Sequence, residues 1–143
     1  MDNENKAPSQ HDKDQEIKKT YLAFCIGNPG HRGEISEPIA KIMKKGIEKV
    51  EVDRQEGVHA TTLFDCLFAG DTISMVRLNP ITGRTHQLRV HMLAMGHPIL
   101  GDDFYAHGDA LKAARCLQLH AEILEFRHPN DETPQKFRVS CPF

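Results

Sequence analysis

The chain has 143 residues, of which 39% are hydrophobic and 27% charged, a composition typical of one modest soluble domain with a small core. The formal net charge of −2 means that the chain as a whole is not basic, so a nucleic-acid partner would have to bind a local patch of cations. No stretch reaches the roughly 18 apolar residues of a membrane-spanning helix and the polar N-terminus lacks the apolar core of a signal peptide, which predicts a cytoplasmic protein with no membrane contact.

The N-terminal third predicts a tail followed by strands and turns. Residues 1–18 are rich in Asp, Asn, Gln and Lys without apolar periodicity, which predicts a disordered tail. Residues 21–26 form an apolar run closed by Gly27, which predicts a strand covered on both faces. Residues 28–39 are full of turn residues and predict a loop, whereas the alternation over 46–53 predicts a half-exposed strand.

The middle of the chain predicts a hairpin. Residues 59–78 contain two apolar stretches separated by Gly70-Asp71, the composition of two strands joined by a tight turn. Pro80 should end the second strand, because proline has no N–H to donate to a sheet and restricts the residue before it.

A helix is predicted near 85–95. Thr82 or Thr85 is a candidate N-cap, and Gly96 suits the position just past the C-terminus. At 100° per residue the apolar side chains occupy two faces of this helix, which predicts that it is buried nearly all round.

The C-terminal part predicts a short helix within 106–116, a strand over 117–126, a turn over 128–134 and a last strand over 135–140. One side of the predicted strand over 117–126 should carry Leu117, Leu119, Ala121, Ile123 and Glu125. The predicted fold class is therefore α+β, a mainly antiparallel or mixed sheet packed with one central helix.

Arg89 is the most unusual residue of the predicted helix. A guanidinium among apolar neighbours must be paired, and a bidentate carboxylate is its usual partner. Asp102 and Asp103 are close enough in sequence to supply that carboxylate. The simplest interpretation from the residues alone is an ion pair that stabilises the fold.

The histidines and cysteines do not predict a metal site. His86 and His91 are five residues apart, about 140° around a helix, which is poor geometry for two ligands of one ion. The four cysteines contain no CxxC pair and are interpreted as buried free thiols rather than disulfides or zinc ligands. No cysteine lies in a recognisable nucleophile motif.

One long segment carries a family resemblance. The stretch NPITGRTHQLRVHMLAMGHPILGD, residues 79–102, closely resembles the signature of the RluA-type pseudouridine synthases. KKTYLAFCIG resembles the family's K-x-Y-x-A-x-x-x-G strand, and LQLHAEILEFRHP resembles its L-x-L-H-A strand. The likeness covers roughly 120 residues in the right order, so residues 19–143 resemble the C-terminal part of the catalytic domain.

The resemblance implies isomerisation of uridine to pseudouridine in ribosomal or transfer RNA, without cofactor or metal. The family's aspartate attacks the flipped nucleoside, and the base detaches, rotates and rejoins through carbon 5. By resemblance Arg89 pairs with that aspartate, and Tyr21 contacts the base and assists proton removal. By resemblance the uridine pocket is lined by Ile99 and Leu100. The positions at which the family orders the site and contacts RNA are Arg84, His86 and Gln87.

One family motif is missing. The family places its aspartate in H-R-L-D-x-x-T-S-G, upstream of the tyrosine strand, and no such motif occurs in these 143 residues. We therefore expect a chain that is inactive alone, as a truncated product, a fragment, or a split enzyme completed by a complementary N-terminal half. The alternatives are a non-catalytic RNA-binding or interaction module that kept the fold, and an unrelated α+β domain with a structural ion pair.

Overall fold

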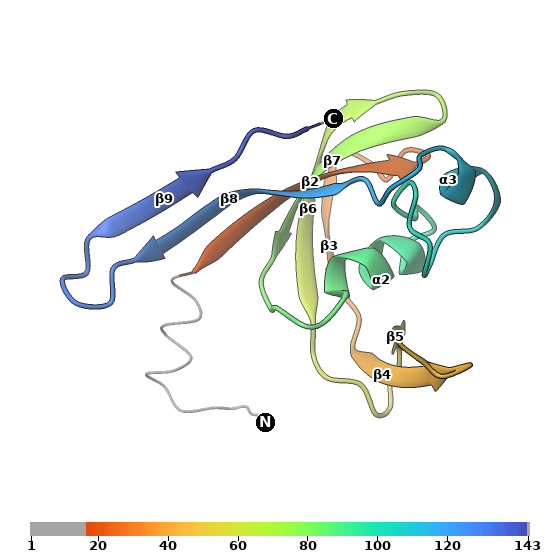
Figure 1. Cartoon of the computed structure of the whole chain (residues 1–143), viewed down its shortest axis with the longest axis horizontal. Helices are drawn as coiled ribbons and strands as arrows, with labels where there is room; N and C mark the ends of the chain where they lie inside the picture. Colours follow the sequence, from red (N-terminus) through yellow and green to blue (C-terminus); the bar gives the residue numbers. More distant parts are fainter. Residues whose placement is uncertain (1–16, 143) are drawn as a thin grey trace.

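The computed structural model describes residues 17–142, and a six-stranded antiparallel sheet runs through its centre (Figure 1). The strand order is β3-β6-β7-β2-β8-β9. The bounds are β2 Lys18–Ile26, β3 Arg32–Ser36, β6 Thr61–Ala69, β7 Ile73–Pro80, β8 Leu119–Arg127 and β9 Pro134–Arg138. This sheet confirms the predicted α+β class, while the prediction of a tail over 1–18 lies almost wholly outside the described residues.

The centre of the sheet follows the predicted pattern. β6 and β7 form the expected hairpin, with Gly70 N–H bonded to the Ile73 carbonyl at the turn, and β7 ends at Pro80. β2 pairs with β7 on one side and with β8 on the other, so its backbone is covered along both edges. Ala23 and Cys25, two residues apart, are completely buried, as alternation on a covered strand requires.

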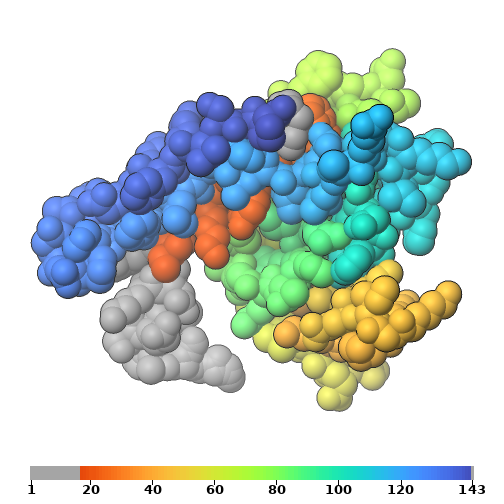
Figure 2. All heavy atoms as spheres, viewed as in Figure 1, coloured from red at the N-terminus to blue at the C-terminus, as the bar shows by residue number. Residues whose placement is uncertain are grey.

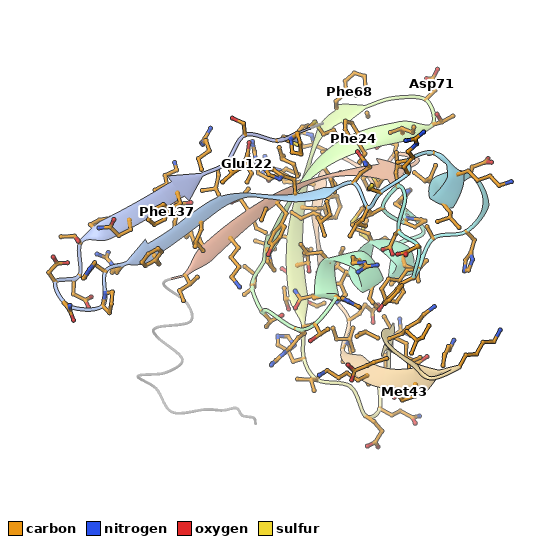
Figure 3. The ribbon with its side chains drawn as sticks, viewed as in Figure 1. Phe24, Met43, Phe68, Asp71, Glu122 and Phe137 are labelled. Atoms are coloured by element: carbon orange, nitrogen blue, oxygen red, sulfur yellow. The ribbon has the colours of Figure 1, made fainter. Side chains whose placement is uncertain are left out.

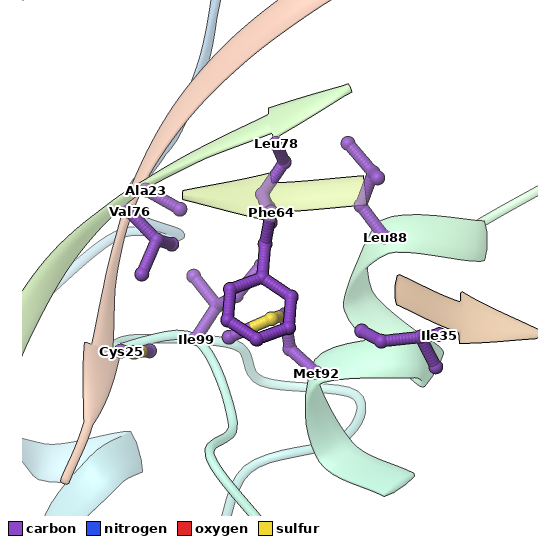
Figure 4. Packing of buried hydrophobic residues seen from close by; sticks show 9 residues of the cluster. All are labelled: Ala23, Cys25, Ile35, Phe64, Val76, Leu78, Leu88, Met92 and Ile99. Atoms are coloured by element: carbon purple, nitrogen blue, oxygen red, sulfur yellow. The ribbon is translucent and has the colours of Figure 1, made fainter. Parts of the chain in front are cut away.

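The predicted helix is α2, Gln87–Ala94, and it packs on one face of the sheet. Leu88 and Met92 pack with the apolar side chains of the sheet around Phe64, and Ile99 lies in the same cluster beside Phe64 (Figure 4). Burial of large side chains such as these contributes about 1.5–3 kcal/mol each to folding. The central helix of the predicted fold is therefore confirmed, one or two residues shorter at each end than predicted.

The helix begins differently from the prediction. Its N-cap is His86, in the left-handed region at φ 55°, and neither Thr82 nor Thr85 caps it. The Thr82 hydroxyl instead donates to the Gln87 side chain, 2.6 Å away, which removes it from the helix end. Gly96 has φ +85°, as predicted for the residue past the C-terminus.

A small second sheet lies on the other side of α2. It consists of β4, Ile39–Lys44, and β5, Ile47–Val52, and it forms the separate orange-yellow block below the helix in Figures 1 and 2. Val50 packs with Val90 of the helix and with Tyr105 in a second core cluster. The helix is thus covered by the large sheet on one side and by this hairpin on the other.

The predicted loop over 28–39 was wrong, because β3 lies within it and β4 begins at its end. Among the described strands β3 lies at the edge of the sheet and pairs with β6 alone, and only Ile35 of its five residues is buried. With one buried side chain, the strand has no period-two apolar pattern that sequence inspection can detect.

The C-terminal segment contains α3, Gly108–Lys112, and the β8–β9 arm, which extends away from the core and carries Phe137 (Figure 3). Thr20 pairs with Ile123 but Tyr21 pairs with Ala121, so Glu122 forms a bulge without a partner on β2. The bulge places Ala121 on the face of Tyr21, while Ile123 lies on the opposite face with Thr20. The predicted single face over 117–126 was therefore wrong.

The cysteines and the helices bear on two further predictions, four buried thiols and no membrane-spanning segment. All four thiols are free, but only Cys25 is buried, where burial and the neighbouring Cys66 raise its pKa to about 12. Cys116 is exposed, which corrects the prediction of four buried thiols. Neither helix within residues 17–142 has the length and apolar character needed to span a membrane.

Candidate active site

Arg89 is paired within the chain. Its Nε and Nη2 atoms donate to the two carboxylate oxygens of Asp102 at 3.0 and 2.6 Å, a bidentate geometry. The Arg89 side chain is 14% exposed and that of Asp102 is 1% exposed. Asp103 lies 3.8 Å from the same guanidinium but is 79% exposed. The expectation of a buried arginine is confirmed, and Asp102 is the partner observed among the alternatives that the sequence left open.

Asp102 also organises the turn that follows it. Its Oδ1 accepts hydrogen bonds from the backbone N–H groups of Phe104 and Tyr105 at 3.1 and 3.2 Å. These bonds fix the two aromatic rings beside Arg89, whose guanidinium carbon lies 5.1 and 5.2 Å from their centroids. Burial lowers the pKa of Arg89, but the hydrogen bonds and charge of Asp102 outweigh it and raise that pKa overall.

Tyr105 connects this turn to the helix start and to the small hairpin. Its hydroxyl lies 2.8 Å from His86 Nδ1 and accepts the Val50 backbone N–H at 3.0 Å. Burial, together with the positive charge of Arg89, lowers the pKa of His86 and keeps the imidazole neutral at pH 7. His86, Arg89 and Asp102 therefore meet in one polar cluster.

Gln87 is buried and orders the preceding loop. Its Nε2 donates to the Thr61 carbonyl and the Thr62 hydroxyl, and its Oε1 accepts from the Thr82 hydroxyl and the Arg84 backbone N–H. A side chain with four such bonds has no donor left for RNA. Arg84 is exposed, bonded to the His59 carbonyl, and lines a hollow of about 360 Å³ beside the small hairpin.

The other residues of the resemblance lie apart from this cluster. Tyr21 is half-buried and packs against the core cluster of Leu88 and Met92, on the sheet face that carries α2. Ile99 is completely buried in that same core, whereas Leu100 belongs to a third cluster around α3. The assignments of these three residues to catalysis and to the uridine pocket stay predictions.

Sequence reasoning did not single out Phe104 and Tyr105, because an aromatic residue after a turn is typical of any core. Arg77 does not lie with Arg84 and Arg89 in one basic patch. Val76 and Leu78 point into the core under α2, so Arg77 between them points to the other face of the sheet. The described residues contain no group of three potential metal ligands.

The buried side chain of His91 makes hydrogen bonds that predict how stability depends on pH. His91 Nδ1 lies 2.8 Å from the Thr62 hydroxyl and its Nε2 lies 2.9 Å from the Glu37 carbonyl. The Glu37 carbonyl can only accept, so the neutral ring carries its proton on Nε2, and Nδ1 accepts from the Thr62 hydroxyl, which itself accepts from Gln87. Burial lowers the pKa of His91, so the folded protein holds the neutral imidazole.

We expect the free energy of unfolding to fall as the pH decreases. The contribution of His91 is fully present above the unfolded-state pKa of about 6.5, and is lost as the pH falls from there toward the lower folded-state pKa. Urea unfolding at pH 7.5, 6 and 5 measures this dependence. The variant His91→Gln should show a smaller drop, whereas His31→Gln, at an exposed position, should behave as wild type. An unchanged drop in His91→Gln would exclude His91 as the cause.

Comparisons with known proteins identify the family. The profile described as RNA pseudouridylate synthase matches residues 5–94. The dual-specificity RNA pseudouridine synthase RluA of Salmonella typhi is 44% identical over 133 residues, and that of Escherichia coli is 41% identical, each match covering 92% of this chain and 60% of the relative. The chain thus spans about three fifths of the length of these relatives.

Solved structures show the same fold. The human RNA pseudouridylate synthase domain containing 1 protein superposes with a TM-score of 0.76 at 32% identity, covering 94% of this chain and 59% of that one. The human domain containing 4 protein superposes with a TM-score of 0.71 at 24% identity. The signature helix, the tyrosine strand beside it and these matches together show that the chain belongs to the RluA-type RNA pseudouridine synthases.

Proposed function

We propose that this chain supplies the arginine-bearing, uridine-binding part of an RNA pseudouridine synthase that acts on ribosomal or transfer RNA. The arrangement of Arg89 carries the proposal. Asp102 uses Nε and one N–H of Nη2, and Nη1 has no hydrogen bond within residues 17–142. A guanidinium has five N–H donors, so a second carboxylate can bind its free edge while Asp102 stays in place.

In this proposal the second carboxylate is the aspartate nucleophile. It attacks the flipped uridine, the base detaches and rotates, and a bond forms through carbon 5 of the base before the aspartate leaves. Arg89 holds the carboxylate at the attacking distance, and Tyr21 contacts the base and assists removal of the proton from carbon 5. Ile99 and Leu100 supply apolar surface for the uridine pocket, after the local opening that their burial requires.

Asp102 does not replace the nucleophile. Its side chain is 1% exposed, and its oxygens already accept bonds from Arg89, Phe104 and Tyr105. Attack on a ribose would require breaking this set of bonds. We therefore propose that the 143 residues alone do not turn over, and that the aspartate comes from a further segment, in the same protein or in a complementary chain.

Release of tritium from RNA labelled at carbon 5 of uridine tests this proposal. The chain alone should release none above background, and a mixture with a separately produced polypeptide carrying an H-R-L-D segment should release it. Turnover by the unaided chain at an enzymatic rate would contradict the proposal. It would mean that a carboxylate within these residues attacks.

The alternative, a non-catalytic RNA-binding module, predicts strong binding without turnover. We expect weak binding instead, because Arg77 lies on the opposite sheet face and leaves few cations near Arg84. For about two phosphate contacts, affinity for single-stranded RNA should fall roughly sevenfold between 50 and 200 mM salt. Fluorescence anisotropy with labelled RNA measures this. Tight binding that barely changes with salt, without activity in any mixture, would favour the alternative.

A further inference from the structure

We propose that Tyr105 is a positioning residue that holds His86 as the tautomer with its proton on Nε2, so that His86 presents a neutral N–H donor to RNA. The inference deepens the proposed function, since it names a contact of the same site. His86 is the residue at the start of α2, between the exposed Arg84 and the buried Arg89.

The two polar neighbours of the Tyr105 hydroxyl determine the direction of its hydrogen bonds. The Val50 N–H can only donate, and it points at the hydroxyl oxygen from 3.0 Å. Within residues 17–142 the remaining polar neighbour of that oxygen is His86 Nδ1, at 2.8 Å. If Nδ1 carried the proton, the hydroxyl would accept twice and its own buried proton would have no acceptor, which costs about 1–3 kcal/mol. The hydroxyl therefore donates to Nδ1.

The imidazole then has its proton on Nε2. A neutral imidazole carries one N–H, so an accepting Nδ1 leaves Nε2 as the donor. Nε2 has no hydrogen-bond partner among the described residues, and the side chain is only partly buried. Burial also raises the pKa of Tyr105, so its hydroxyl retains the proton that it donates.

The ring has little freedom to turn. It meets the rings of Phe104 and Tyr105 edge to face at centroid distances of 5.6 and 5.7 Å. Those rings are fixed by Asp102 through their backbone N–H groups, and Lys49 of the small hairpin donates to the Phe104 carbonyl. A fixed neutral donor suits a carbonyl of a base or a phosphate oxygen, without the long-range attraction of a cation.

Nitrogen-15 NMR of the imidazole tests the tautomer. Wild-type His86 should show an unprotonated Nδ1 and a protonated Nε2 at neutral pH. Tyr105→Phe keeps the ring but removes the hydroxyl, and should give a mixture of tautomers with faster hydrogen exchange at the Val50 amide. Ser74→Ala is the matched control, since it removes a buried hydroxyl bonded to the Gly27 carbonyl at the far end of the sheet. That control should leave His86 and Val50 unchanged.

RNA affinity, measured on the same three proteins, tests the contact. Tyr105→Phe should bind labelled RNA roughly fivefold more weakly, the effect of one misplaced hydrogen bond, and Ser74→Ala should bind as wild type. A protonated Nδ1 in wild type, or an unchanged tautomer in Tyr105→Phe, would overturn the positioning role. A changed tautomer with unchanged affinity would overturn the RNA contact alone. Absence of RNA binding by wild type would count against the proposed function, while the NMR result decides the tautomer independently.

Discussion

Arg89→Ala is expected to abolish any uridine isomerisation that a complementing H-R-L-D segment restores. The substitution removes the free guanidinium edge that is proposed to hold the nucleophile, and also uncovers Asp102, whose buried charge would repel the incoming carboxylate. Loss of positioning and of charge compensation together should reduce turnover by at least about a hundredfold, within the range for a catalytic electrostatic contact. Tritium release by the mixture measures the effect.

The matched control is Arg84→Ala. Arg84 belongs to the same signature but is exposed, and within residues 17–142 its side chain bonds only to the His59 carbonyl, so truncating that side chain should weaken RNA binding and leave turnover at saturating RNA largely intact. Arg89→Lys separates charge from geometry, because a lysine keeps the cation but cannot bind two carboxylates side by side. Turnover in Arg89→Ala near that of Arg84→Ala would contradict the role assigned to Arg89.

Asp102→Ala is expected to lower the free energy of unfolding by about 3–5 kcal/mol, the usual cost of removing one partner from a buried ion pair. Arg89 would keep its charge in a largely buried position, and the N–H groups of Phe104 and Tyr105 would lose their acceptor. A loss of this size is a large part of the stability of a small domain. Urea unfolding monitored by circular dichroism measures it.

Asp103→Ala provides the comparison at the neighbouring position. Its carboxylate is 3.8 Å from the same guanidinium but mostly exposed, so the substitution should change stability by less than about 1 kcal/mol. If Asp102→Ala unfolded at the same urea concentration as Asp103→Ala, the pair of Arg89 and Asp102 would not stabilise the fold in the way described.

Much of the fold was predictable because its signals are local. The turn at Gly70-Asp71 and the apolar run around Ala23 lie within a few residues of the structure that they specify. β3 gave no such signal, since Ile35 is its only buried residue and its pairing partner Thr62 is distant in sequence. An exposed edge strand takes its conformation from the neighbouring strand, and a local pattern cannot show that.

The candidate site was predictable in kind but not in detail. A guanidinium at position 89 among apolar residues required a carboxylate, and that requirement is chemical. The choice between Asp102, Asp103 and an aspartate elsewhere depends on how the chain turns after Gly101. Tyr105 had no sequence signal, because its role comes from a hydroxyl that meets a backbone N–H from β5, 55 residues away.

The bulge at Glu122 makes the C-terminal arm sensitive to chain length rather than to side-chain identity. Glu122 has no partner on β2, so many side chains fit at that position (Figure 3). Deleting the residue would instead give continuous pairing, with Ile123 still opposite Thr20 and Ala121 still opposite Tyr21, and would remove the bend and extra twist that a bulge gives its strand. Every later residue of β8 would keep its face, but the direction in which β8 and β9 extend away from the core would change. The number of residues in β8 therefore sets the direction of the arm, whereas the side chain at position 122 does not.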